Sequence, residues 1–183
     1  MRLYTLADGK LQDNTTGNSY GAPTNLGTQG IITDSGSKHN LRWEVSTVNP
    51  DKGTFTLLIR RGDDTHNRKN ILETFSNVTM DPNSNNYIGK AVGDQYYSTA
   101  TDENGKIFLK LNGDYPNKSK YVRVEVVNTT PNYLDENGNV ADTRNYNKLP
   151  TPGSGSFHGS FSGGSDGTVT HPKQFYDKIT KTN

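Results

Sequence analysis

The stretch that decides the fold is Leu41-Arg-Trp-Glu-Val-Ser-Thr-Val-Asn-Pro-Asp-Lys-Gly-Thr-Phe-Thr-Leu-Leu-Ile-Arg-Arg61. Apolar and polar residues alternate from Leu41 to Thr47, which is the period-two pattern of a half-buried strand. The segment Asn49–Gly53 has turn chemistry, because Pro presets the backbone and Gly accepts a positive φ. A second strand is predicted over Thr54–Arg61, so the whole stretch predicts a β-hairpin.

Three segments further along the chain also predict strands. Ile71–Val78 follows a polar loop, and Lys106–Leu111 follows the turn Asp102–Gly105. Tyr121–Val127 alternates most clearly, with three valines on one face and charged residues on the other. Strands separated by many turn-forming residues favour an α+β, strand-dominated protein, built on a β-sheet, sandwich or barrel-like domain.

Two short helices complete the prediction. Ser84–Val92 places its apolar residues near one face, and Ser84 is the expected N-cap. Pro172–Thr182 is expected to open a second helix, with an apolar patch formed by Phe175, Tyr176 and Ile179. We expect the natural polypeptide to continue beyond this helix, because such a patch needs a packing partner.

The chain is predicted to contain four regions. These are a loop-rich arm with short strands at Arg2–Leu6 and Gly30–Ile32 (1–40), a β-rich domain with one short helix near 84–92 (41–130), a Gly/Ser/Pro-rich loop region (131–171) and the opening helix (172–183). Within the third region, Pro150–Ser156 is read as a linker or loop because it consists almost entirely of Pro, Gly, Ser and Thr.

Charge and composition exclude several function classes. Lys+Arg total 20 against Asp+Glu 19, so the basic face of a nucleic-acid-binding protein is not expected. No apolar run approaches the roughly 20 residues that span a bilayer, and Met1–Asp8 lacks the apolar centre of a signal peptide. The absence of Cys excludes disulfides and thiolate chemistry. We expect neither nucleic acid nor membrane as a partner, and synthesis in a cytoplasm.

Candidate metal sites all have a simpler explanation. The four His residues lack zinc-site spacing: His39, His66, His158 and His171. Asp63–His66 offers ligands for a divalent cation, but an ordinary solvated loop accounts for it. The Asp-Glu-Asn-Gly loops at Asp102 and Asp135 lack the Gly and Glu that an EF-hand requires, and predict turns with a left-handed Gly. We therefore predict no metal ion and no cofactor.

Adhesion and glycosylation signals are also weak. Arg61–Asp63 matches the cell-adhesion tripeptide Arg-Gly-Asp, but a strand leaving into a loop explains it. Four Asn-x-Ser/Thr sequons begin at Asn14, Asn77, Asn117 and Asn128. Glycosylation needs a secretory route, which no signal supports.

The glycine-rich segment Gly163–Gly167 is the candidate for phosphate-binding or catalytic chemistry. Lys173 has the wrong offset for a phosphate-binding loop. A serine hydrolase needs a nucleophile, a base and an orienting carboxylate, for which the nearest set is Ser165, His158 and Asp166. We expect no nucleophile elbow of the Gly-x-Ser-x-Gly kind at this set. We predict no catalytic residue and no enzyme, and keep a hydrolase as one alternative.

Four segments, in order, resemble the contractile bacteriophage tail sheath family. Gly53–Asp64 resembles its "GTF-L-I-R" strand, and Leu72–Ile88 resembles "E-F-N-L-S-L-D-P" followed by "N-Y-I". Tyr115–Val126 is similar to "S-Y-V-R-V-E", and Phe161–Gly167 to "L-G-G-S-D-G". The terminal helix bearing Phe175 and Tyr176 also fits.

The resemblance covers about residues 40–183, and Leu3–Asp8 with Ser35–Arg42 is similar to the T-even-type myovirus branch. Val78 and Met80 stand where the family has Leu, and Ala91 stands where it commonly has a β-branched residue; these apolar exchanges preserve packing. The chain resembles a fragment of the subunit, without its C-terminal linking segment.

The resemblance implies a structural subunit of the virion tail that polymerises helically around the tail tube. It contracts without a cofactor and drives the tube into the host envelope for genome ejection. The implied partners are copies of itself, the tail tube and the baseplate. The fragment alone, lacking linking arms, is expected to be a monomer.

The main alternative is a phage-borne carbohydrate- or host-binding β-module. It predicts one exposed aromatic face, for which the candidates are Tyr87, Tyr96, Tyr97, Tyr115 and Tyr121. A sheath subunit predicts scattered aromatics instead, because Tyr is also common at subunit contacts.

Overall fold

The computed structural model describes residues 1–7, 41–62, 64–155, 159 and 161–163. Its elements in chain order are β1 (Arg2–Thr5), β2 (Leu41–Asn49), β3 (Thr54–Arg61), β4 (Ile71–Thr79), α1 (Ile88–Val92), β5 (Tyr96–Thr101), β6 (Ile107–Asn112), β7 (Val122–Glu125) and the 3₁₀ helix η1 (Thr143–Lys148). The strands dominate and the helices are short, which confirms the α+β, strand-rich class. The predicted strand at Gly30–Ile32 and the helix at Pro172–Thr182 lie outside the described residues.

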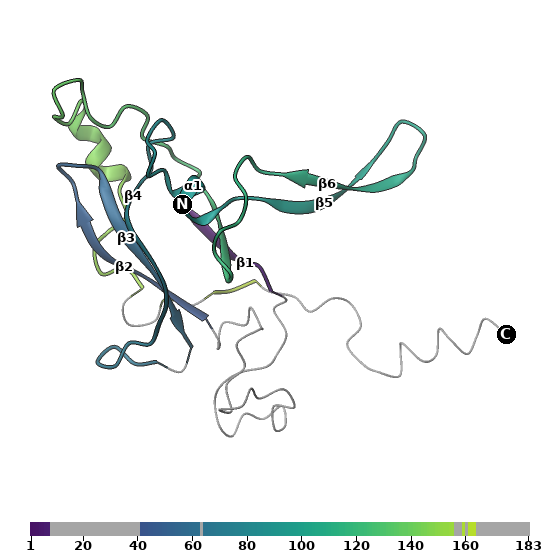
Figure 1. Ribbon diagram of the computed structural model, residues 1–183, viewed down its shortest axis with the longest axis horizontal. Coiled ribbons are helices and arrows are strands. Elements are labelled where there is room, and N and C mark those ends of the chain that lie inside the picture. Colours follow the sequence, from purple (N-terminus) through teal and green to yellow (C-terminus); the bar gives the residue numbers. More distant parts are fainter. Residues whose placement is uncertain (8–40, 63, 156–158, 160, 164–183) are drawn as a thin grey trace.

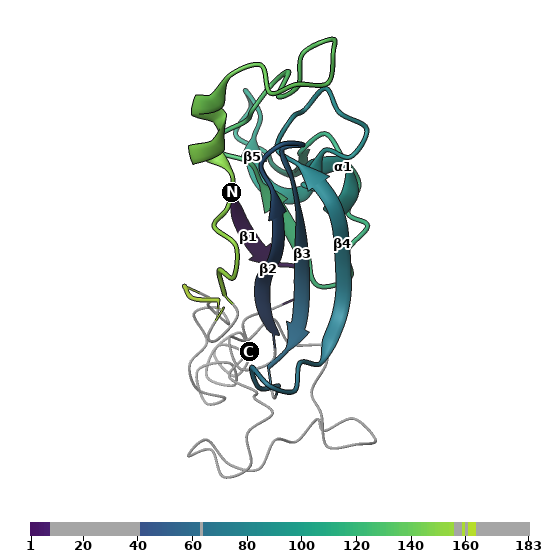
Figure 2. The ribbon, with the colours of Figure 1, turned by 90° about the vertical axis from the view of Figure 1, so that its left-hand side faces the viewer.

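The central sheet is antiparallel, with strand order β2-β3-β4 (Figure 2). The predicted hairpin is confirmed: β2 and β3 pair from Leu41 opposite Arg61 to Asn49 opposite Thr54. At the turn, Gly53 has φ +64° and its amide donates to the Pro50 carbonyl. Irregularities in both ladders give the long strands extra local twist.

The β2–β3 turn is clamped from outside by Tyr133. Its hydroxyl donates to the Pro50 carbonyl at 2.5 Å, and its ring is 2% exposed. A Cβ at Gly53 would lie 2.3 Å from this ring, so the position requires glycine for space as well as for its positive φ.

The core lies between the central sheet, α1 and the two-stranded β1–β7 sheet. Its buried members are Leu41, Val45, Phe55, Leu57, Ile59, Val78, Met80, Tyr87, Ile88, Val92, Val122 and Val124. The N-terminal β1 pairs antiparallel with β7, more than a hundred residues away, with Leu3 opposite Val124. The predicted strands at the N-terminus and around Tyr121–Val127 are therefore confirmed in shorter form.

The predicted helix over Ser84–Val92 is only partly correct. Ser84 forms a turn instead of an N-cap, since its carbonyl and hydroxyl accept from the amides of Tyr87 and Asn86. The helix begins at Ile88, after Tyr87, which makes no side-chain cap bond. Burial of Ile88 and Val92 against β4 and β7 stabilises this single turn, as expected for a helix too short to form alone.

The Pro/Gly/Ser-rich segment read as a linker or loop covers an edge of the central sheet. The Trp43 amide donates to Gly159, the Val45 amide to Ser154, and the Gly153 amide to Val45. A Cβ at Gly155 would lie 2.3 Å from the Trp43 carbonyl oxygen, so small residues permit this close approach. The same predicted loop region contains η1, which the sequence analysis did not anticipate.

Candidate interaction surface

A two-stranded ribbon, β5–β6, projects from the body of the molecule (Figure 1). Its strands pair antiparallel in an unbroken register from Tyr96 opposite Asn112 to Thr101 opposite Ile107. The connecting turn is closed by Asp102, whose carboxylate accepts from the amides of Asn104 and Lys106. A ribbon of two strands is marginally stable alone, so its stability depends on the contacts that its faces make.

One face of the ribbon carries no charged residue. Directly opposed residues share a face, and side chains alternate along each strand, so three pairs lie together. They form what we call the ribbon face: Tyr97 with Leu111, Thr99 with Leu109, and Thr101 with Ile107. Tyr97, Leu109 and Ile107 are 69%, 69% and 70% exposed.

Exposed apolar side chains are concentrated on this element. Among the described residues, six of the eleven large apolar side chains exposed to solvent belong to β5 and β6. Scattered single exposures are ordinary, whereas a contiguous apolar patch marks an interaction site. The ribbon face is therefore the strongest candidate functional surface of the described chain.

The opposite face of the ribbon is mixed in character. It carries Lys110 and Phe108, and the Asn112 amide donates to the Ser98 hydroxyl at 2.8 Å. The two faces therefore differ in polarity, although the strands that form them are the same. This difference provides matched control positions within one element.

Arg123 of β7 ties the root of the ribbon to the body. Its guanidinium lies between two aromatic rings, 4.1 Å from the Tyr4 centroid and 4.2 Å from the Tyr96 centroid. Beside it, the Tyr4 hydroxyl donates to Glu125 at 2.7 Å. This hydrogen bond, with the charges of Arg2 and Arg123, lowers the pKa of the Glu125 carboxyl.

A pocket of about 370 Å³ opens at this root. Among the residues that line it are Tyr4, Tyr87, Asp94, Tyr96, Arg123 and Glu125. Burial raises the pKa of Tyr87, and the nearby carboxylate of Asp94 adds to this effect. Aromatic rings and carboxylates together are a lining suited to polyhydroxylated ligands.

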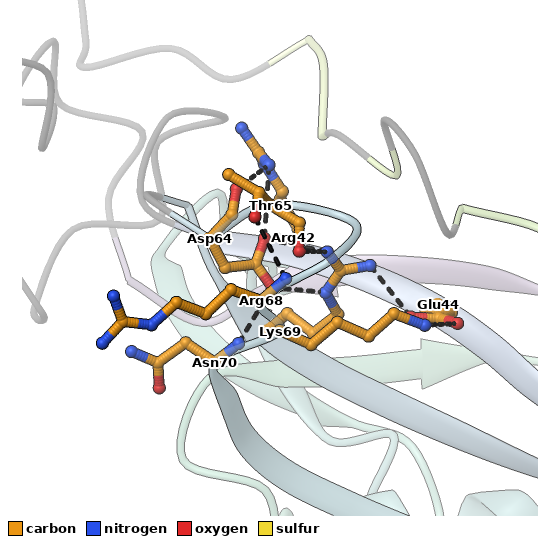
Figure 3. Close-up of polar contacts among 8 residues, drawn as sticks. Arg42, Glu44, Asp64, Thr65, Arg68, Lys69 and Asn70 are labelled. Atoms are coloured by element: carbon orange, nitrogen blue, oxygen red, sulfur yellow. Dashed lines mark hydrogen bonds and ion pairs between the residues drawn. The ribbon is translucent and has the colours of Figure 1, made fainter.

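A cluster of charged side chains, which we call the Arg60 cluster, lies toward the end of the β2–β3 pair opposite its turn, and Figure 3 shows its polar contacts. Arg60 is fully buried and donates to Glu44 at 2.9 Å and to both oxygens of Asp64. Lys69 donates to the other Glu44 oxygen at 2.6 Å, and Arg42 to the Asp64 carbonyl at 2.6 Å.

This cluster anchors a loop. Burial acts to lower the pKa of Arg60, but its hydrogen bonds and ion pairs with Asp64 and Glu44 outweigh burial and raise it. Asp64 also accepts from the Asn70 amide, which closes the loop between β3 and β4. Because its carboxylates are occupied by internal partners, we assign the cluster a structural role.

The candidate metal-binding residues do not form a site among the described residues, where no group of three or more potential ligands occurs. Asp64 of the Asp63–His66 segment belongs to the Arg60 cluster instead. The loops at Asp102 and Asp135 are turns with positive-φ glycines, as predicted. His39, His158 and His171 lie outside the described residues, as does Asp63.

The remaining motif residues are placed only in part. Arg61 is the last residue of β3, as the strand-exit interpretation expects. The expectation that no Gly-x-Ser-x-Gly pattern occurs is wrong for the sequence, because Gly163–Gly167 has these letters; of this segment the structure describes only Gly163. Ser165, Asp166 and Lys173 lie outside the described residues, as does Asn14 among the sequons.

The five candidate tyrosines do not form one exposed face. Tyr87 and Tyr115 make an edge-to-face pair at 5.9 Å, and Tyr121 packs against the core. Tyr96 stacks on Arg123 at the pocket, whereas Tyr97 lies on the ribbon face. No strand was predicted at β5, so the ribbon is a structural finding, although Tyr96–Thr101 has the β-branched and aromatic content of a strand.

No helix of the described chain has the length and apolarity needed to cross a bilayer. Comparison with known proteins found no match to any family model, curated protein or solved structure.

Proposed function

We propose that the chain is part of a structural subunit of a contractile phage tail sheath. The subunit polymerises helically around the tail tube and contracts to drive it into the host envelope. The observation that carries the proposal is the uncharged, exposed ribbon face on a projecting element, a surface that fits protein–protein contact. The ordered sequence resemblance supplies the family.

Rigid-body movement during contraction requires domains that keep their shape. The buried Arg60 cluster and the Tyr133 clamp hold the two ends of the central sheet, which supports such behaviour. Small shifts of rigid subunits between two packings release energy stored in the lattice. On this proposal the subunit needs neither a cofactor nor a catalytic residue.

The proposed partners are copies of the same subunit, the tail tube and the baseplate. The proposed location is the tail of the virion, after assembly in the cytoplasm of the bacterial host. A net charge of +1 supports self-association, because copies repel one another weakly.

Negative-stain electron microscopy of the polypeptide at its full natural length tests the proposal. Long, hollow, striated tubes are expected. Dispersed particles under conditions that assemble known sheaths would contradict it.

A carbohydrate- or host-binding module is the second candidate, and the root pocket favours it. Tyr4, Tyr87 and Tyr96 meet Asp94 and Arg123 there, in a volume of about 370 Å³. Saturable binding in a glycan screen, abolished by Asp94→Ala and unchanged by Leu109→Ala on the ribbon, would support this function over the first.

A further inference from the structure

The chain contains three Asn-Gly pairs, which begin at Asn104, Asn112 and Asn137. This dipeptide is prone to spontaneous loss of the asparagine side-chain amide, because glycine has no Cβ to hinder attack by its own backbone nitrogen. We infer that Asn104, at the tip of the β5–β6 ribbon, is the first of the three to deamidate, and that Asn112, at the root of the ribbon, is protected. This modification is independent of the proposed function and needs no partner protein.

The reaction uses only groups of the chain and water. The Gly105 backbone nitrogen loses its proton to hydroxide and attacks Cγ of the Asn104 side chain. A C–N bond forms there, the former amide nitrogen leaves as ammonia, and a cyclic succinimide results. Water then opens this ring at either of its carbonyl carbons, and the product is aspartate or isoaspartate. Nothing is oxidised or reduced.

Two of the three pairs occupy the same kind of exposed turn. Residues 102–105 and 135–138 have the same sequence, Asp-Glu-Asn-Gly, and both asparagines are exposed. In each turn the glycine amide donates to the aspartate carbonyl at 3.0 Å, and the glycine has a positive φ. No described atom lies within 4 Å of a Cβ built at either glycine, so the succinimide ring has room to form.

The hydrogen bond on the attacking nitrogen must break before the attack. The rate in the folded chain is therefore the intrinsic rate multiplied by the fraction of molecules in which the turn is open. Since the two turns share their four residues, their intrinsic rates are closely matched. The ratio of the two measured rates then reports how readily each turn opens.

The ribbon tip is the less anchored of the two turns. β5 and β6 pair only with each other among the described strands, and a two-stranded ribbon is marginally stable. The second turn follows Tyr133, which is only 2% exposed, and Leu134 pairs with Val140 across it. We therefore expect Asn104 to react faster than Asn137.

The third pair is held closed at the root of the ribbon. The Asn112 side-chain amide donates to the Ser98 hydroxyl at 2.8 Å and to the Lys110 carbonyl at 3.2 Å. A Cβ at Gly113 would lie 2.6 Å from the Asp94 carbonyl oxygen, so the backbone here is tightly packed. Attack requires the side chain to leave its hydrogen bonds and the packed backbone to rotate, which protects Asn112.

Deamidation changes the tip of the candidate interaction surface. Aspartate at position 104 adds a negative charge next to Asp102 and Glu103. Isoaspartate also inserts an extra carbon atom into the backbone of the turn that places Thr101 opposite Ile107. The pairing at the tip should therefore loosen as the protein ages.

Peptide mapping by mass spectrometry tests the inference. The whole chain is incubated at mildly alkaline pH, both folded and unfolded in urea, and the loss of each asparagine amide is followed over time. In urea the three pairs should react at similar rates. In the folded chain Asn104 should react at least about tenfold faster than Asn112, with Asn137 between them.

Ser98→Ala is the matched variant, because it removes a hydrogen bond from the Asn112 side chain and leaves the tip unchanged. It should accelerate deamidation of Asn112 and leave the rate at Asn104 unaltered. Retention of the Asn104 amide in the folded chain would overturn the inference. Reaction at Asn112 or Asn137 ahead of Asn104 would overturn it as well.

Discussion

The central sheet and the ribbon are built from similar strands but differ in what covers them. β3 buries Leu57 and Ile59 completely, whereas β6 leaves Leu109 and Ile107 about 70% exposed. Both elements contain many β-branched and aromatic residues, so strand propensity does not distinguish them. The difference is that α1 and β7 close over the inner face of the central sheet, whereas within the described part of the chain no element closes over the ribbon face.

This contrast separates residues kept for folding from residues available for contact. Apolar exposure concentrated on one projecting element indicates a surface whose burial comes from outside the described chain. Substitutions in the core of the central sheet should therefore lower the free energy of unfolding. Substitutions on the ribbon face should instead weaken association and leave the free energy of unfolding almost unchanged.

Removing the buried cation should have the largest effect. Arg60→Ala leaves the carboxylates of Glu44 and Asp64 without their shared partner in a buried site. We expect a loss of about 3–5 kcal/mol in the free energy of unfolding, measured by urea denaturation. Arg68→Ala, at an exposed loop position, is the control and should change stability by less than about 0.5 kcal/mol. Similar values for the two variants would refute the anchoring role.

Two leucine-to-alanine variants, one in β3 and one in β6, compare the central sheet directly with the ribbon. Leu57→Ala should cost about 2–5 kcal/mol because it opens a cavity at a fully buried position. Leu109→Ala should cost no more than about 0.5 kcal/mol, because its side chain is already mostly in solvent. Thermal and urea unfolding of both variants measure the difference. Comparable losses would show that the ribbon belongs to the folding core.

Alkaline pH should weaken the Tyr133 clamp. Burial raises the pKa of Tyr133 to about 12 from a usual value of 10.0, with nearby Tyr146 and Asp51 contributing. The folded state therefore keeps the hydroxyl protonated, and its stability contribution is complete below pH 10 and lost as pH rises toward 12. Tyr133→Phe should cost about 1 kcal/mol at neutral pH and flatten the alkaline decline. An unchanged decline in this variant would place the titrating group elsewhere.

Arg123→Ala should loosen the root of the ribbon with the smallest global effect. The loss of two stacking contacts, each worth about 0.5–1 kcal/mol at exposed sites, acts mainly on local opening. Hydrogen exchange should become faster for the amides of β5 and β6 and stay unchanged for β3. Equal acceleration in β3 would indicate a global loss of stability instead.

The sequence predicted the elements with strong local signals. Period-two alternation with a Pro/Gly turn identified the β2–β3 hairpin, and the Asp-Glu-Asn-Gly segments identified two turns. It did not predict the pairing of β1 with β7, since partners far apart in sequence are set by burial of Leu3 and Val124 in a shared core.

The candidate surface was the least predictable part. β5 is rich in Thr and Ser and lacks apolar alternation, so its strand identity depends on its pairing with β6. The predicted helix start at Ser84 is wrong because the Ser84 hydroxyl accepts from the Asn86 amide in a turn of its own. The helix begins at Ile88, where burial of its apolar residues starts. The Arg60 cluster was also missed, because Arg60 and Glu44 occupy ordinary strand positions and meet only through cross-strand packing.

Cryo-electron microscopy with helical reconstruction of the full-length polypeptide tests self-assembly most directly. We expect tubes in which the face formed by Tyr97, Leu109 and their neighbours is buried. Unassembled particles, or tubes in which this face points into solvent in both extended and contracted states, would contradict it.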